Sequence, residues 1–108
     1  MLMQEDRLIK FKAKTFRALS DPIRLSIIEI LKDGEKCVCE IMPFLGVPQP
    51  IVSRHLKILK DSGLVNDRKD GTRRLYSITN QKILILIDEL SPEIVKDLSK
   101  HAIRQITV

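Results

Sequence analysis

Cys37 and Cys39 are the residues of this chain whose type and spacing could do chemistry, and they are its only cysteines. Two cysteines this close together in a cytosolic protein more often serve as sensor or metal thiolates than as a disulfide staple. Three interpretations remain open from the residues alone. The pair binds a soft metal ion through its thiolates, it forms a strained disulfide in response to redox state, or it packs as two small apolar side chains.

The spacing of the two cysteines raises a geometric problem. Side chains two positions apart on a regular helix diverge by roughly 200°. If Cys37 and Cys39 share one ion, the start of the predicted helix Val38–Leu45 has to distort or unwind. Such a distortion would shift the next helix, to which this one is joined through Pro48.

That next helix begins at Gln49 and is predicted to stop at Gly63. Its apolar side chains fall on one side at helical spacing. Another arc gathers amides, hydroxyls and cations, with no carboxylate before Asp61: Gln49, Ser53, Arg54, Lys57 and Lys60. This arc suits the major groove of DNA, where such side chains read base edges or grip phosphates. His55 is a further candidate contact, but it lies nearer the apolar arc, so we expect it to pack or to hydrogen-bond to backbone or phosphate rather than to read a base.

A β-hairpin is predicted directly after this helix. Two β-prone runs flank Asp70-Gly71, a strong hairpin signal because glycine tolerates positive φ. Four cations surround the turn: Arg68, Lys69, Arg73 and Arg74. Cations crowded on an exposed hairpin repel one another, so we expect them to stabilise nothing inside the fold and to face a polyanion. A basic hairpin beside a groove-reading helix is the winged helix-turn-helix arrangement.

Composition and charge agree with a small DNA-binding protein. The chain has 108 residues, 44% of them hydrophobic and 31% charged, which fits one globular domain. Residues 49–76 hold seven Lys and Arg against three Asp, whereas the rest carries twelve basic against eleven acidic side chains. We expect no signal peptide and no membrane span, and hence a cytoplasmic protein. No nucleophile–base pair or phosphate loop is evident, so we expect no enzyme activity.

The remaining helices complete a mainly α fold with a small β-hairpin, in the order α-α-α-α-β-β-α-α. Residues 1–108 are predicted to form a single winged helix-turn-helix domain with terminal dimerisation helices. Ile83–Ile87 is apolar on every side and needs a cover, most simply from a second copy in a two-fold dimer. The alternative is that the final segment from Ser91 to Ile106 folds back over it. The expected interface comprises Leu8, Phe11, Ile83, Leu84 and Ile87.

Over roughly residues 14–80 the chain resembles the ArsR/SmtB family of winged-helix metalloregulators. The resemblance rests on several short motifs, which are Ala18-Leu19-Ser20-Asp21-Pro22-Ile23-Arg24-Leu25, Cys37-Val38-Cys39-Glu40-Ile41, Gln49-Pro50 with Val52-Ser53-Arg54-His55-Leu56, Leu59 with Gly63-Leu64-Val65, and Arg68-Lys69 with Gly71. It implies a homodimeric repressor on an imperfect palindrome in double-stranded DNA, released by a metal or another inducer, with no obligatory cofactor.

Within the family the Cys-Val-Cys is most similar to the arsenical-responsive repressors, whose thiolates bind soft As(III) or Sb(III). Those repressors carry a third cysteine where this chain has Met42, so a small-molecule thiol would have to complete a three-sulfur site. The Asp and His pattern of the family's zinc and nickel sites is absent. Thiol redox sensing remains an alternative, as does a winged helix that mediates protein contacts without sensing an inducer.

Overall fold

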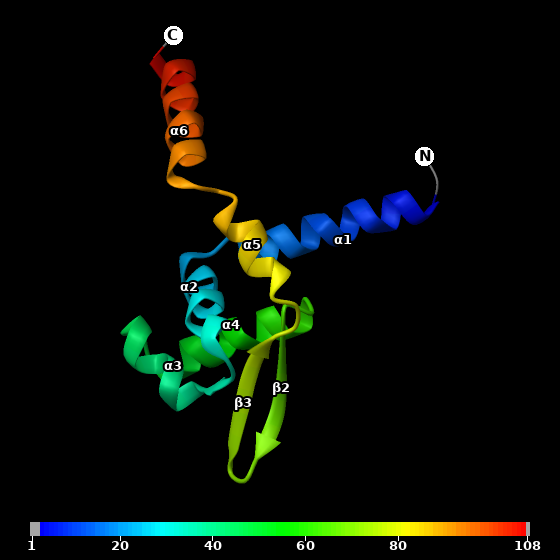
Figure 1. The fold of residues 1–108 in the computed structure, drawn as a ribbon, viewed down its shortest axis with the longest axis vertical. Coiled ribbons are helices and arrows are strands. Elements are labelled where there is room, and N and C mark those ends of the chain that lie inside the picture. Colours follow the sequence, from blue (N-terminus) through cyan, green and yellow to red (C-terminus); the bar gives the residue numbers. More distant parts are fainter. Residues whose placement is uncertain (1–2, 108) are drawn as a thin grey trace.

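The computed structural model describes residues 3–107, and the side chains of residues 4–104. Ten elements follow one another within these described residues (Figure 1): α1 (Met3–Leu19), α2 (Pro22–Ile30), the 3₁₀ turn η1 (Leu31–Asp33), β1 (Lys36–Cys37), α3 (Val38–Leu45), α4 (Gln49–Asp61), β2 (Val65–Asp70), β3 (Arg73–Ile78), α5 (Lys82–Asp88) and α6 (Pro92–Thr107). The predicted mainly α fold with a β-hairpin is confirmed.

Local sequence signals explain where the central helices begin and end. The Asp21 carboxylate caps α2 by accepting hydrogen bonds from the backbone N–H groups of Ile23 (2.8 Å) and Arg24 (3.2 Å). Pro22, which lacks an N–H, occupies the first turn. Gly46 ends α3 with a φ of 64°, a left-handed conformation that glycine adopts without steric cost. The turn that follows leads directly into α4.

The sheet contains one strand more than the sequence predicts. The strand order is β1-β3-β2, with both pairings antiparallel. In β1, Lys36 pairs with Tyr76 and Cys37 with Leu75. A strand of two residues is too short to show the alternation of buried and exposed side chains. Its pairing partner in β3 is also about forty residues away in sequence, so no local signal predicts it. The hairpin of β2 and β3, called the wing below, turns at Gly71 as predicted.

The hydrophobic core lies between α2, α3, α4 and the base of the wing. Its large, fully buried side chains are Ile27, Ile28, Leu31, Ile41, Val52, Leu56, Leu59 and Val65. The apolar arc of α4 therefore faces inward, and the opposite arc is left to solvent. This packing fixes the rotation of α4 about its own axis.

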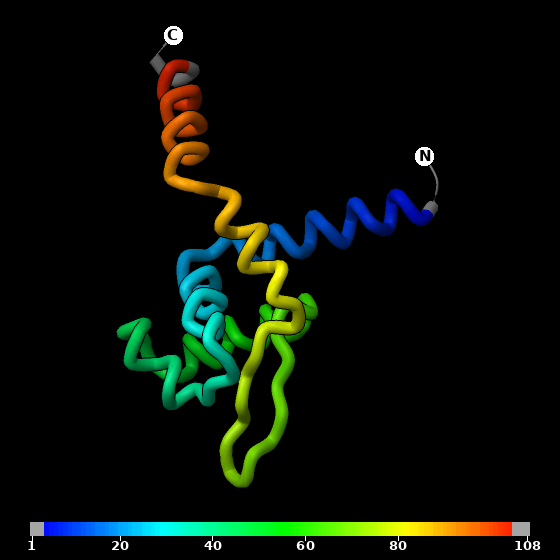
Figure 2. Tube along the Cα trace, in the orientation of Figure 1, coloured from blue at the N-terminus to red at the C-terminus, as the bar shows by residue number. Residues whose placement is uncertain are grey.

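Two helices project from this core. Figures 1 and 2 show α1 and α6 pointing away from the body of the molecule, so α6 does not fold back over α5. The radius of gyration is 16.5 Å, compared with about 13 Å for a compact chain of this length. In the part of the chain that the structure describes, no helix is long and apolar enough to span a membrane.

The apolar faces of the projecting helices are exposed. In α1 this holds for Leu8, Ile9, Phe11 and Phe16, and in α6 for Ile94, Val95, Leu98 and Ile103. Ile83, Leu84 and Ile87, which the sequence pattern places in the dimer interface, pack partly buried against the core of their own chain. The apolar side chains that α5 leaves exposed are Ile85 and Leu86, followed by Leu90 just beyond its end.

Candidate nucleic-acid interface and cysteine pair

The polar face of α4 is fully presented to solvent. The five predicted contact residues, Gln49, Ser53, Arg54, Lys57 and Lys60, are all exposed. Their exposure follows from the buried arc on the other side of the helix. Together they form a stripe of amide, hydroxyl and cationic groups along α4, the set of donors that reads base edges and phosphates.

His55 does not belong to this stripe. It is only 7% exposed, and its Nδ1 lies 3.1 Å from Nη1 of Arg24, an α2 residue. His55 therefore lies away from the exposed stripe of α4, and its place next to the apolar arc is the reason. The expectation that it packs rather than reads a base is the one that fits.

The wing cations are not the unpaired, mutually repelling charges that the sequence indicates. Arg68 pairs with Glu35, Arg73 with Asp70 (3.3 Å) and Arg74 with Asp67 (2.9 Å). On α4, Lys57 pairs with Asp61 (3.0 Å) and Lys60 with Asp67 (2.9 Å). Of the predicted contact cations, only Arg54 and Lys69 have no ion-pair partner among the described residues.

These carboxylates change the interpretation of the basic region. Glu35 lies outside residues 49–76, the stretch in which the positive charge is concentrated. It accepts a hydrogen bond from Arg68 of the wing, 33 positions away. The hydrogen bond from Arg68 lowers the pKa of Glu35, with burial opposing it. The wing cations therefore have acidic partners within the fold, which the sequence pattern does not indicate. The side chains of Arg68, Arg73 and Arg74 are still about half exposed, so the N–H groups that the ion pairs do not use stay accessible to solvent.

The two cysteines lie at the junction between β1 and α3 and are joined by a disulfide. Their Cα atoms are 5.2 Å apart. Cys37 is the last residue of β1 and the N-cap of α3, with extended backbone angles (φ −80°, ψ 167°), and only Cys39 is helical. The 200° divergence of a regular helix therefore does not apply. The two sulfur atoms meet here without unwinding of α3, because Cys37 lies outside the helix.

The surroundings of the pair are asymmetric. Cys37 is 3% exposed, whereas Cys39 is exposed to solvent. The backbone N–H of Cys37 donates to the Glu40 carboxylate (3.1 Å), which anchors the start of α3. Met42 packs against the hydrophobic core. Within residues 4–104 no three His, Cys, Asp or Glu side chains cluster closely enough to hold a metal ion.

Two further pairings connect the cysteines to the wing. Cys37 lies opposite Leu75 of β3, and Leu75 lies opposite Arg68 of β2, so the three residues form one row across the sheet. Arg68 then pairs with Glu35, which precedes β1. Glu35 gives no local sequence signal for this role, because only the folded sheet brings it to Arg68.

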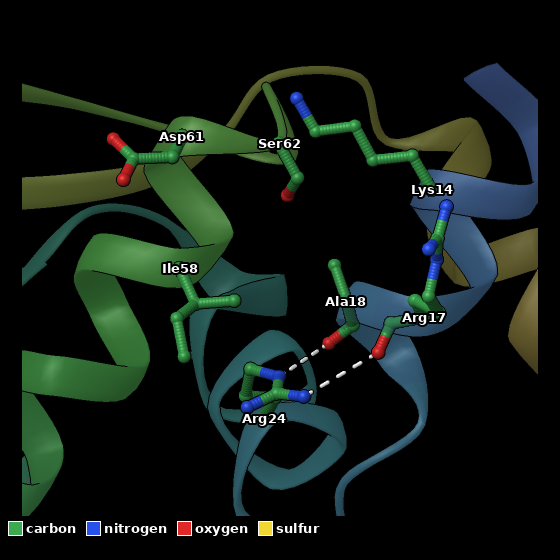
Figure 3. Close-up of a pocket in the computed structure, with 7 residues that line it drawn as sticks. All are labelled: Lys14, Arg17, Ala18, Arg24, Ile58, Asp61 and Ser62. Atoms are coloured by element: carbon green, nitrogen blue, oxygen red, sulfur yellow. Dashed lines mark hydrogen bonds between the residues drawn. The ribbon is translucent and has the colours of Figure 1, made fainter. Parts of the chain in front are cut away.

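A hollow of about 360 Å³ lies between α1 and the C-terminal end of α4. Figure 3 shows the Arg24 side chain within it, donating from Nε to the Ala18 carbonyl and from Nη2 to the Arg17 carbonyl (3.4 Å). The same guanidinium faces His55. Arg24 thus connects the last turn of α1 to α4.

Comparison with known proteins agrees with this geometry. Residues 21–67 match the family described as bacterial regulatory protein, arsR family. The HTH-type transcriptional regulator MJ1325 of Methanocaldococcus jannaschii is 45% identical over 72% of this chain and 92% of its own length. The arsenical resistance operon repressor of Staphylococcus aureus is 36% identical over 69% of this chain and 72% of its own. For several other curated relatives the match spans only 53% to 62% of their lengths.

A solved structure has the same architecture. The homodimeric winged helix-turn-helix DNA-binding domain of Mb0332 from Mycobacterium bovis superposes with a TM-score of 0.79 and 28% identity, covering 90% of this chain and 93% of that one. The chain therefore belongs to the ArsR family of winged helix-turn-helix transcriptional regulators, which are not enzymes.

Proposed function

We propose that this protein is a homodimeric repressor that binds an imperfect palindrome in double-stranded DNA and releases it when Cys37 and Cys39 bind a soft thiophilic ion. The observation that carries the proposal is the meeting of both sulfur atoms at the start of α3, the first helix of the helix-turn-helix. Arsenite and antimonite are the candidate inducers. The cytoplasm, where thiols stay mostly reduced, is the compartment that suits such a site.

DNA binding is supported by the exposed stripe on α4 and by the wing beside it. In this proposal Gln49, Ser53 and Arg54 read base edges, and the cations of α4 and the wing contact phosphates. Arg54 and Lys69 lack ion-pair partners among the described residues, so binding phosphate breaks no intramolecular pair at these two positions. Two copies related by a two-fold axis would place two reading helices on the two halves of a palindrome.

Dimerisation is supported by the apolar faces that the single chain leaves uncovered. Leu8 and Phe11 of α1 are 54% and 58% exposed, as expected for interface residues. Leu86 and Leu90 line a hollow of about 330 Å³ with Phe16. Exposed apolar surface on two projecting helices is typical of interaction sites. The relative from Mycobacterium bovis is homodimeric.

The donor atoms fit a thiophilic ion only in part. The reduced pair offers two thiolates, and soft trivalent arsenic or antimony prefers sulfur ligands. Met42 packs against the core and is a thioether, so a small-molecule thiol is the proposed third ligand. The arsenical resistance operon repressor among the relatives supports arsenite as the first inducer to test.

Inducer binding at the pair can influence both DNA-contacting elements. Cys39 is in the first turn of α3, which packs against α4. Cys37 is hydrogen-bonded through its strand to β3 of the wing. A change in the positions of the two sulfur atoms would therefore act on the reading helix from one side and on the wing from the other.

Redox sensing is the second candidate, and the disulfide between Cys37 and Cys39 is the observation that favours it. Oxidation would convert two thiols into the disulfide with loss of two protons and two electrons to a disulfide or peroxide oxidant. The same two positions would then act as a switch without a metal.

A titration on duplex DNA from the protein's own upstream region separates these functions. Fully reduced protein should bind with salt-dependent affinity, and arsenite should lower that affinity about 5- to 150-fold, the usual range of allosteric coupling. Cys37→Ser and Cys39→Ser should bind DNA normally but lose the response. Release by a disulfide oxidant and not by arsenite would favour redox sensing. If the protein shows no salt-dependent binding to DNA, the remaining explanation is a winged helix that mediates protein contacts.

A further inference from the structure

A polar hollow of about 340 Å³ lies where the reading helix α4 meets the wing. Its lining comes from both elements: Ser53, Lys57, Lys60, Asp61, Asp67, Arg74 and Tyr76. Three of these side chains are cations, and those of Lys60 and Arg74 are 49% and 52% exposed. The hollow therefore opens to solvent on the face that the proposed function assigns to DNA.

Asp67 lies at the centre of this arrangement. Its Oδ1 accepts from Lys60 Nζ of α4 (2.9 Å), and its Oδ2 accepts from Arg74 Nη1 of β3 (2.9 Å). The Asp67 side chain is only 9% exposed, in contrast to its two partners. The hydrogen bond from Lys60, together with the charges of Lys60 and Arg74, lowers the pKa of Asp67 although burial opposes it. The carboxylate is thus ionised at neutral pH.

A carboxylate on a surface that meets a polyanion needs a reason, since its charge repels phosphate. Without Asp67, the ammonium of Lys60 and the guanidinium of Arg74 would repel each other across the hollow. With it, both cations are held in one place, and each keeps N–H donors that Asp67 does not use. Holding flexible side chains in position before binding reduces the entropy lost on binding.

We propose that Asp67 is a positioning residue that holds Lys60 and Arg74 together so that both grip one backbone phosphate of duplex DNA in this hollow. The inference rests on the proposed function, because the phosphate belongs to the DNA that α4 and the wing contact. It assigns a DNA-binding role to an acidic residue that does not itself touch the phosphate.

The test is Asp67→Asn, measured by fluorescence anisotropy on a fixed DNA duplex over a series of salt concentrations. General electrostatics predicts tighter binding, because one negative charge leaves the surface. Positioning predicts the opposite: about tenfold weaker binding and a salt slope smaller by about 0.9, the value for the one phosphate that the protein no longer neutralises.

Asp70→Asn is the matched control. Asp70 is in the same strand and pairs with one cation, Arg73, at 3.3 Å, but its side chain is 48% exposed and it bridges nothing between α4 and the wing. We expect Asp70→Asn to bind DNA as the wild type does or more tightly. If Asp67→Asn also binds as well as the wild type or better, Asp67 is not a positioning residue.

A double-mutant cycle keeps the test decisive if Asp67→Asn unfolds. If Lys60 and Arg74 act as one unit, Lys60→Gln, Arg74→Gln and the double variant should lose similar amounts of affinity. Additive losses would show two independent contacts and overturn the inference. Failure of the wild type to bind any duplex would instead refute the proposed function, and the two failures are therefore distinguishable.

Discussion

The Nη1 atom of Arg24 lies 3.1 Å from Nδ1 of His55, which joins α2 to the buried side of the reading helix α4. A guanidinium can only donate hydrogen bonds, so in a hydrogen bond between this pair Nδ1 of His55 is the acceptor. The other N–H groups of Arg24 reach the carbonyls of Ala18 and Arg17 at the end of α1. One side chain therefore fixes the reading helix relative to the projecting helix α1.

Arg24→Gln should lower the free energy of unfolding by about 1–3 kcal/mol, because hydrogen bonds from a charged group are removed and the Ala18 carbonyl loses its part-buried hydrogen bond to Arg24. Urea denaturation monitored by circular dichroism measures the change. Arg17→Gln is the control, since its side chain is exposed beside the same hollow and should leave the midpoint unchanged. An unaltered midpoint for Arg24→Gln would show that the link contributes nothing to stability.

Leu86→Glu combined with Leu90→Glu should produce a folded monomer that no longer binds the palindrome. Both side chains are exposed in the single chain, at 42% and 58%, so a charge there costs the monomer little but is buried at the proposed interface. Sedimentation equilibrium measures the association state. Lys82→Glu, an exposed change in the same helix, should remain dimeric.

Leu84→Glu distinguishes the two sides of α5. Leu84 packs against its own core, so this variant should lose thermal stability as well as association. A stable, dimeric Leu86→Glu/Leu90→Glu variant would contradict the interface proposed here.

Cys39 should react with iodoacetamide before Cys37 in the reduced protein. The reagent needs access to the thiolate, and Cys37 is 3% exposed whereas Cys39 is exposed. Peptide mass spectrometry after short labelling times gives the two rates, with the urea-unfolded protein as the reference for equal access. Equal rates in the folded protein would indicate that the start of α3 opens faster than the label reacts.

The elements with local signals could be predicted from the sequence. The reading helix follows from its apolar arc, and the wing follows from Asp70-Gly71. The parts that the sequence does not reveal depend on contacts between distant residues. The strand of Lys36 and Cys37 exists only because β3 is beside it, and the partner of Arg68 is 33 residues away.

The same limit applies to the candidate site. The exposed face of α4 and the inward position of His55 follow from helical periodicity, but the hydrogen-bond partner of His55, Arg24, is 31 residues away and gives no local signal. The start of α3 at Val38, between Cys37 and Cys39, agrees with the predicted helix, but the pattern of residue types does not reveal the strand that ends at Cys37, because that strand depends on pairing with β3.

Acid should remove the stabilisation that Asp67 and Glu35 provide. Their ordinary pKa values are 3.8 and 4.5, and the hydrogen bonds from Lys60 and Arg68, respectively, lower both in the folded protein. A carboxyl group whose pKa is lower when folded stabilises the protein fully above its ordinary pKa. That contribution disappears as the pH falls through the folded pKa.

Thermal unfolding of the wild type, Asp67→Asn and Glu35→Gln as a function of pH measures this effect. At about pH 6 the wild type should melt at a higher temperature than either variant, because both ion pairs are formed. Below about pH 3 the differences should shrink as the wild-type carboxylates become protonated. Because salt screens these partly exposed pairs, the gap at about pH 6 should also narrow in about 1 M NaCl. A gap that stays constant at every pH would mean that shape and packing, rather than charge, account for the effect of the substitutions.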